Sequence, residues 1–226
     1  MALSEETRAR LAPQAAEIIG RYPKARSALL PLLHLVQSQE GYVSQDGIEF
    51  CAEQLGLTEA DVTGVVSFYT MYKRKPVGEY HVGVCTNSLC AVMGGDAIFA
   101  DLQEHLGIGN DETTADGKVS IEHVECNAAC DYAPVVMVNW EFFDNMTPAK
   151  ARDLVDDLRS GVAVSPTRGA PRLVTWKQTG QILAGFPDGQ AADGNTAGEA
   201  TLAGLRVARQ QGWTPDDGPR AAEGTQ

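Results

Sequence analysis

Two short segments, Cys85-Thr-Asn-Ser-Leu-Cys90 and Cys126-Asn-Ala-Ala-Cys130, decide how this sequence folds and what it holds. Four residues separate the first pair of cysteines and three separate the second. Two closely spaced pairs in separate loops can converge on one metal centre when the fold brings the loops together. The spacing therefore predicts a site with four thiolate ligands that come from two loops.

The width of the gaps distinguishes between the metals that thiolates bind. Structural zinc sites usually carry C-x2-C pairs, because a tight turn sets four sulfurs around one small ion. Gaps of four and three residues suit a larger group with two irons, in which each iron takes two thiolates. The spacing thus predicts a [2Fe–2S] cluster and electron transfer, with a four-thiolate zinc site as the structural alternative.

Two other sulfur chemistries fit the sequence less well. A thioredoxin-type redox pair needs C-x-x-C, which the sequence lacks. A Rieske centre needs two histidines in place of two cysteines, and neither loop contains a histidine. The fifth cysteine, Cys51, lies on an expected helix away from both pairs. We expect it to be a buried apolar side chain rather than a ligand.

The sequence around the cysteines alternates between strand and helix patterns. The segment 80–84 leads directly into Cys85, and the segment 119–124 ends just before Cys126. Apolar spacing predicts helices over 94–106 and from Thr147 to Ser160, and two further strands over 134–139 and 140–143. This order predicts a compact α/β sandwich in which both cysteine pairs lie at strand ends on one edge.

The flanking parts of the chain have a different character. Residues 1–75 read as a small helical unit, with expected N-caps at Ser4, Ser27, Ser44 and Thr58. Residues 161–226 contain 11 of the 23 glycines and 5 of the 11 prolines, which is typical of an extended or disordered tail. Within this tail, Arg172–Phe186 is the segment that we expect to dock a partner. The predicted division is therefore 1–75, 76–160 and 161–226.

The charge of the chain excludes several classes of partner. Residues 85–160 hold 14 acidic against 4 basic side chains, within a net charge of −12 for the chain. Such a surface repels nucleic acid and anionic lipid headgroups. No apolar run approaches the ~18 residues that span a bilayer, and no secretory signal is visible at the start. We therefore expect no nucleic-acid binding and no direct membrane insertion.

The run Val124–Val136 resembles the second cluster loop of the thioredoxin-like [2Fe–2S] ferredoxins. The segments 85–90 and 113–117 resemble other parts of the same family. The helical front with Phe68–Tyr72 is similar to one branch, the E subunits of NADH–quinone oxidoreductase, respiratory complex I. The resemblance covers roughly residues 10–160 and leaves the tail outside. It implies an N-terminal helical bundle, a thioredoxin-like α/β sandwich and an irregular C-terminal tail.

The resemblance also implies a function. One [2Fe–2S] cluster would be ligated by Cys85, Cys90, Cys126 and Cys130, with backbone N–H groups donating to the sulfurs. The chain would be an electron-transfer subunit of complex I, beside a partner that binds FMN and NADH and among other peripheral-arm subunits. It would lie on the cytoplasmic side of the membrane, without an NADH or flavin site of its own.

Some details and alternatives stay open from the sequence. Thr86, Asn87 and Ser88 are candidates to surround the cluster and support its sulfurs, and the family usually has Leu-Gly where this chain has Asn127-Ala128. The matching diaphorase subunit of an NAD-reducing hydrogenase or formate dehydrogenase would share the same chemistry. A zinc-stapled interaction module is the alternative of another class, and a free electron-carrier ferredoxin is a third.

Overall fold

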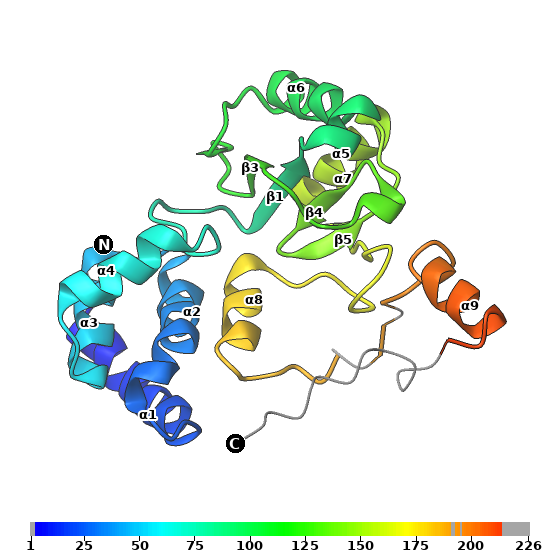
Figure 1. The fold of residues 1–226 in the computed structure, drawn as a ribbon. Coiled ribbons are helices and arrows are strands. Elements are labelled where there is room, and N and C mark those ends of the chain that lie inside the picture. Colours follow the sequence, from blue (N-terminus) through cyan, green and yellow to red (C-terminus); the bar gives the residue numbers. More distant parts are fainter. Residues whose placement is uncertain (1–2, 191–192, 195, 214–226) are drawn as a thin grey trace.

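A computed structural model describes residues 3–190, 193–194 and 196–213 of the chain (Figure 1). A helical unit and an α/β unit lie side by side, and the segment after residue 160 runs across both. The α/β fold class predicted from the sequence is confirmed. In the described part of the chain, no helix is both long and apolar enough to cross a bilayer.

Three of the helices in the helical unit begin at N-caps that the sequence predicts. The unit consists of α1 (Glu5–Gly20), the 3-10 turn η1 (Ala25–Ala28), α2 (Leu29–Glu40), α3 (Gln45–Leu55) and α4 (Glu59–Phe68). The side chains of Ser4, Ser44 and Thr58 accept hydrogen bonds from the first turns of α1, α3 and α4. The predicted cap at Ser27 is wrong, because the chain enters α2 through η1, without a side-chain cap.

The helical unit has a core of its own. Leu11 and Ile18 of α1 pack with Leu32 and Leu33 of α2, all fully buried. Cys51 lies in the same core without contact to solvent, and burial raises the pKa of its thiol. The expectation that Cys51 is a buried apolar side chain is thus confirmed.

The α/β unit is built on a five-stranded sheet in the order β2-β3-β1-β4-β5. Its strands are β1 (Tyr80–Cys85), β2 (Glu112–Thr113), β3 (Val119–Val124), β4 (Val136–Val138) and β5 (Glu141–Phe143). β1 and β3 are parallel, with Cys85 opposite Val124, and the other neighbours are antiparallel. The sequence did not indicate β2, which is too short to show a period.

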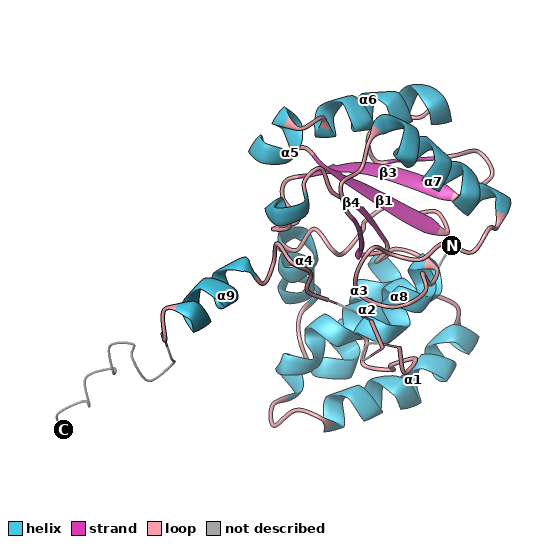
Figure 2. Cartoon of the chain, turned by 90° about the vertical axis from the view of Figure 1, so that its right-hand side faces the viewer, coloured by secondary structure: helices cyan, strands magenta, loops and turns pink. Residues whose placement is uncertain are grey.

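Helices cover both faces of this sheet. Figure 2 shows α6 (Gly95–Leu106) and α7 (Pro148–Ser160) on one face, and the helical unit together with α8 (Trp176–Leu183) on the other. Thr147 caps α7 and Pro148 stands at its first position, as predicted. The short helix α5 (Ser88–Val92) lies between β1 and α6 and carries Cys90.

The segment after residue 160 is more ordered than an extended or disordered tail. It contains α8 and α9 (Ala203–Gln210), joined by irregular stretches. α8 packs against α2, and its Trp176 is only 2% exposed. The glycine and proline content does not predict this order, because the large apolar side chain of Trp176 anchors the segment. Residues 191–192, 195 and 214–226 of the expected tail lie outside the described residues.

Packing of α8 involves the aromatic side chains of Arg172–Phe186, whereas the docking of a partner by this segment stays a prediction. Within this segment, Trp176 is buried and Phe186 packs against the helical core, so its aromatic side chains are taken up by the chain itself rather than left for a partner. The division into three domains at residues 75 and 160 stays a prediction.

Candidate metal centre

Cys85 and Cys90 form the buried half of the candidate site. Cys85 ends β1, Cys90 lies on α5, and both join a small apolar cluster with Ala133 and partly buried Val124. Burial raises the pKa of the Cys90 thiol to about 11, although the Val135 backbone lies within hydrogen-bonding range of it. A bound metal ion would favour the thiolate form of Cys90, because its positive charge would compensate for the solvation that the thiolate loses on burial.

Gly95 allows the start of α6 to approach this pair closely. A Cβ atom at Gly95 would lie 2.4 Å from the carbonyl oxygen of Cys85 and 2.9 Å from that of Cys90. No side chain fits into that space, so the backbone at residues 94–95 lies directly against both cysteines. Two successive glycines, Gly94 and Gly95, allow this close approach.

Cys126 and Cys130 form the exposed half of the site. They flank a loop in which the amide of Ala128 donates a hydrogen bond of 3.2 Å to the Cys126 sulfur. Ala128 has φ +51°, the left-handed region in which glycine is preferred. The family resemblance implies that backbone N–H groups of the loop donate to the sulfurs, and this contact is one such bond.

The fold brings the two halves to the same edge of the sheet. β1 and β3 run parallel and end together at Cys85 and Val124, so Cys126 follows only two residues beyond this edge. The Cys130 sulfur lies close enough to Cys90 to act on its pKa. The predicted arrangement of both pairs at one edge is thus confirmed.

The donor set fits a two-iron cluster. Four thiols in two pairs match its ligand requirement, and the Ala128 amide offers the N–H···S bond that such clusters use. A further donor, the side-chain amide nitrogen of Asn127, is buried in the loop without a protein partner. Among the described residues, no group of three or more His, Cys, Asp or Glu side chains is arranged to hold a metal ion.

The polar residues of the first loop have structural roles. Asn87 caps α5, and its side chain accepts a hydrogen bond of 2.8 Å from the amide of Ser88. The Thr86 hydroxyl lies 3.4 Å from Nδ1 of the exposed His123. The peptide bond between Ala133 and Pro134 is cis.

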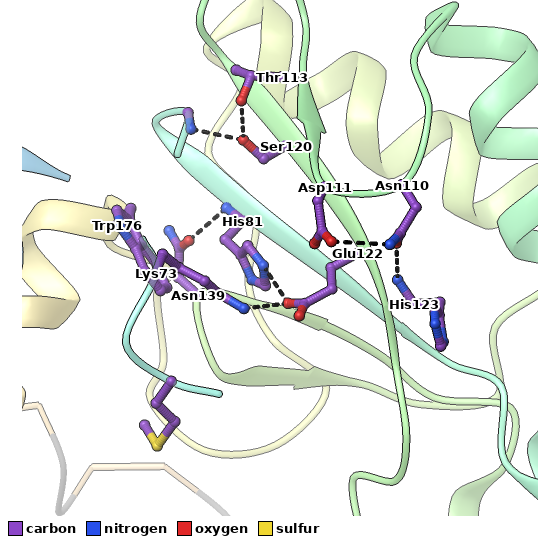
Figure 3. Close-up of polar contacts among 12 residues, drawn as sticks. Lys73, His81, Asn110, Asp111, Thr113, Ser120, Glu122, His123, Asn139 and Trp176 are labelled. Atoms are coloured by element: carbon purple, nitrogen blue, oxygen red, sulfur yellow. Dashed lines mark hydrogen bonds and ion pairs between the residues drawn. The ribbon is translucent and has the colours of Figure 1, made fainter. Parts of the chain in front are cut away.

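A buried polar network on β1 and β3 escaped prediction from the sequence. Figure 3 shows Lys73 and His81 both directed at the carboxylate of Glu122, with His81 Nε2 at 2.8 Å. Burial alone would raise the pKa of Glu122, but the bonds from His81 and Lys73 lower it to about 2. Burial also lowers the pKa of His81, so this ring donates as neutral imidazole at neutral pH. Burial along β3 does not alternate, so no local pattern marks the partly buried Glu122.

The network lies beside the linker, residues 69–79 between α4 and β1, rather than beside the cysteines. Together with Arg74 and Lys75 it lines a cavity of about 250 Å³ between the linker and the sheet, which no cysteine lines. The His81 ring also packs against those of Trp140 and Trp176, at centroid distances of 5.4 and 5.2 Å, and the two indoles contact each other. We infer that this network joins the helical unit to the sheet and takes no part in holding a metal.

Comparisons with known proteins agree with this geometry. Residues 15–159 match the family described as thioredoxin-like [2Fe-2S] ferredoxin. A relative from Mycobacterium bovis, named as the E subunit of NADH-quinone oxidoreductase, is 63% identical over 95% of this chain and 85% of its own length. NADH-quinone oxidoreductase subunit 2 from Thermus thermophilus is 40% identical over 64% of this chain and 82% of its own.

One solved structure shares the fold. A chain of an NAD+-reducing [NiFe]-hydrogenase in the air-oxidized state superposes with a TM-score of 0.53 at 19% identity. The match covers 59% of the present chain and 23% of the hydrogenase chain.

The similarity reaches further along the chain than the sequence motifs indicate. At 95% coverage, the match to the Mycobacterium bovis relative includes most of the segment after residue 160, whereas the family match ends at residue 159. The family's cofactor is a [2Fe–2S] cluster, and the cysteine pairs at the sheet edge supply a suitable donor set. This chain belongs to the thioredoxin-like [2Fe-2S] ferredoxin family.

Proposed function

We propose that this chain is the electron-transfer subunit of an NADH–quinone oxidoreductase, with its [2Fe–2S] cluster ligated by Cys85, Cys90, Cys126 and Cys130. The observation that carries the proposal is the parallel pairing of β1 and β3, which ends both strands at the cysteine-bearing edge. The relatives from Mycobacterium bovis and Thermus thermophilus, both named as subunits of that enzyme, support the assignment.

The proposal assigns the hydride chemistry to a neighbour. NADH gives up two electrons as a hydride, and a flavin is the cofactor that can release them one at a time. A [2Fe–2S] cluster takes up a single electron. We therefore place FMN and the NADH site on a partner subunit, with this chain beside it in the peripheral arm on the cytoplasmic side of the membrane.

The chain's own residues would tune the cluster in opposite directions. The Ala128 amide donates to the Cys126 sulfur, and hydrogen bonds to sulfur stabilise the more negative reduced state. The acidic side chains of residues 85–160 oppose the addition of an electron. The exposure of Cys126 and Cys130 puts this half of the site in contact with water or with a partner.

A second assembly uses the same chemistry. The fold shared with a chain of an NAD+-reducing hydrogenase favours the diaphorase unit of such an enzyme as the alternative host. In that assembly the cluster would again exchange electrons with a flavin, but the final partner would be a hydrogenase rather than quinone. The two hosts differ in the subunits that would accompany this chain.

The test is a purification of the tagged full-length chain from native membranes, followed by identification of its partners and by flavin and iron analysis. The proposal expects an assembly that contains FMN, oxidises NADH and reduces quinone. A tagged chain that carries iron but is recovered with a hydrogenase would favour the alternative. A chain recovered with zinc and no flavin-containing partner would contradict both.

A further inference from the structure

Two segments from beyond the family match lie against the second cysteine loop. Residues 167–168 contact it from the sheet side and residues 198–201 from the outside, and we call these two segments together the clasp. The first segment meets Tyr132 and the second meets both Asp131 and Tyr132, the two residues that follow Cys130. Cys130, Asp131 and Tyr132 form one 3-10 turn, so contacts to the last two residues act on the ligand's own backbone.

The inner contact is made by Arg168. Its Nε lies 3.0 Å from Oδ2 of Asp144, and its Nη2 donates a bond of 3.2 Å to Oδ1 of the same carboxylate. The guanidinium lies over the rings of Phe142 and Tyr132, at 4.2 and 5.3 Å from their centroids. Both charged side chains are largely buried, so the cation is held in one place and fixes the plane of the Tyr132 ring.

Backbone pairing places Arg168 against this ring. The amide of Thr167 donates a bond of 2.8 Å to the carbonyl of Phe142, and Arg168 bridges to Phe142 as a short extension of the sheet beyond β5. The amide of Asn145 donates to the carbonyl of Tyr132 at 2.9 Å. The inner side of the turn is therefore tied to the sheet edge by both backbone and side chains.

The outer contact closes over the hydroxyl end of the same tyrosine. The amide of Ala200 donates a bond of 3.3 Å to the Tyr132 hydroxyl, and the Thr201 hydroxyl donates one of 2.6 Å to the Asp131 carboxylate. Gly198 packs directly on the ring end, where an added Cβ atom would lie 2.1 Å from the hydroxyl oxygen and 3.2 Å from Cζ. The Tyr132 ring is thus enclosed between Arg168 and Gly198.

We propose that the clasp positions the Cys126–Cys130 loop and so steadies the half of the candidate site that this loop carries. The inference rests on the proposed ligation and adds Arg168, Gly198 and Thr201 as positioning residues that act through Asp131 and Tyr132. The second cysteine pair is the exposed half of the site, so it has the greater need of such support.

Glycine-to-alanine variants offer a matched test in the full-length chain. Gly198→Ala inserts a methyl group against the Tyr132 hydroxyl and should lift the outer segment of the clasp. Gly204→Ala, six residues further along the same tail, adds the same group where no atom lies within 4 Å. Tyr132→Phe removes the clashing oxygen while it keeps the ring that Arg168 covers. The double variant Gly198→Ala with Tyr132→Phe therefore tests for steric relief.

Hydrogen exchange in the metal-free chain is the first readout, because it does not depend on the cluster. We expect amides of residues 126–133 to exchange about tenfold faster in Gly198→Ala, the loss expected when about two hydrogen bonds are released. Gly204→Ala should match the wild type, and the double variant should resemble Tyr132→Phe alone. Equal exchange in Gly198→Ala and Gly204→Ala would overturn the proposal, and so would a double variant that exchanges faster than Gly198→Ala.

The reconstituted chain supplies a second readout. We expect Gly198→Ala to lose iron to a chelator about tenfold faster and to show a more positive midpoint potential, because water stabilises the added electron. An unchanged potential together with an unchanged rate of iron loss would contradict the positioning role. Failure of the wild-type chain to assemble a two-iron cluster would instead contradict the proposed function. The hydrogen-exchange experiment on the metal-free chain would still test whether the clasp positions the loop.

Discussion

The indole Nε1 of Trp176 donates a hydrogen bond of 2.7 Å to the carbonyl oxygen of Gly41, 135 residues earlier in the chain. The backbone amide of the same tryptophan donates a bond of 2.8 Å to the carbonyl of Glu79 at the start of β1. One residue therefore ties the end of α2 to the first strand of the sheet. The part of the chain around Trp176 is therefore packed into the folded body and holds its two units together.

Trp176→Ala should lower the free energy of unfolding by about 3–5 kcal/mol, because it removes a large buried ring and leaves a cavity. Trp176→Phe should cost about 1–3 kcal/mol, because it leaves the carbonyl of Gly41 without its donor. Denaturant unfolding measures both. Leu183→Ala, on the exposed end of the same helix, is the control and should cost less than about 1 kcal/mol. Equal losses for Leu183→Ala and Trp176→Ala would show that α8 does not join the units through Trp176.

Glu122→Gln should destabilise the chain by about 2–4 kcal/mol, because it leaves the ammonium of Lys73 without its buried counter-charge. Glu79→Gln, in the more exposed pair with Lys118, is the matched control and should cost under about 1 kcal/mol. The pKa of Glu122 is about 2 in the folded chain, below its ordinary 4.5, so the stability it contributes is present above pH 4.5 and is lost between pH 4.5 and 2. A wild-type chain with no more acid sensitivity in this window than Glu122→Gln would contradict this.

Ala128→Gly should stabilise the second cysteine loop. A non-glycine residue at φ +51° costs about 1–2 kcal/mol of strain, which Ala128→Gly would remove. Glycine is also more flexible in the unfolded chain, and this offsets part of the gain in stability. We expect a net gain of about 0.5–1 kcal/mol, with the bond from this amide to the Cys126 sulfur retained. Ala129→Gly, at a buried neighbour with φ −116°, should instead destabilise. Thermal unfolding of the two variants in parallel measures the difference, and a loss in Ala128→Gly would refute it.

Mild acid should destabilise the helical unit through His34. Burial lowers the pKa of this histidine to about 4 from 6.5, so the unfolded chain binds a proton between these values and the folded chain does not. Stability is therefore full above pH 6.5 and falls by about 2 kcal/mol by pH 5. His34→Phe, which keeps a ring against Tyr72, should remove this part of the pH dependence. The partly exposed His105→Gln should retain it, and identical pH profiles for the two variants would contradict the assignment.

The features that the sequence predicts correctly depend on local chemistry. Ser4, Ser44 and Thr147 cap helices because their side chains reach amides three residues away. The edge that carries the cysteines is predictable for a similar reason, since each pair follows a strand directly and parallel strands end together. The approach of α6 to Cys85 and Cys90 could be expected from the two glycines at its start.

The features that the sequence hides depend on long-range contacts. Nothing near Trp176 indicates that its partners are Gly41 and Glu79, so the segment around it resembles a loose tail. Glu122 resembles an ordinary surface carboxylate until β3 pairs with β1 and brings His81 to it. The contact of Thr201 with Asp131 closes a loop of 70 residues, which no local pattern encodes.

Metal and sulfide analysis of the anaerobically reconstituted full-length chain, with EPR of its reduced form, tests the central claim most directly. We predict about two irons and two sulfides per chain and an axial-type [2Fe–2S] signal in the wild type. Cys85→Ser should destroy or severely distort the cluster, whereas Cys51→Ser, in the helical core, should leave visible absorption unchanged. A colourless wild-type chain that binds one zinc, or loss of colour in Cys51→Ser, would contradict the assignment of the four ligands.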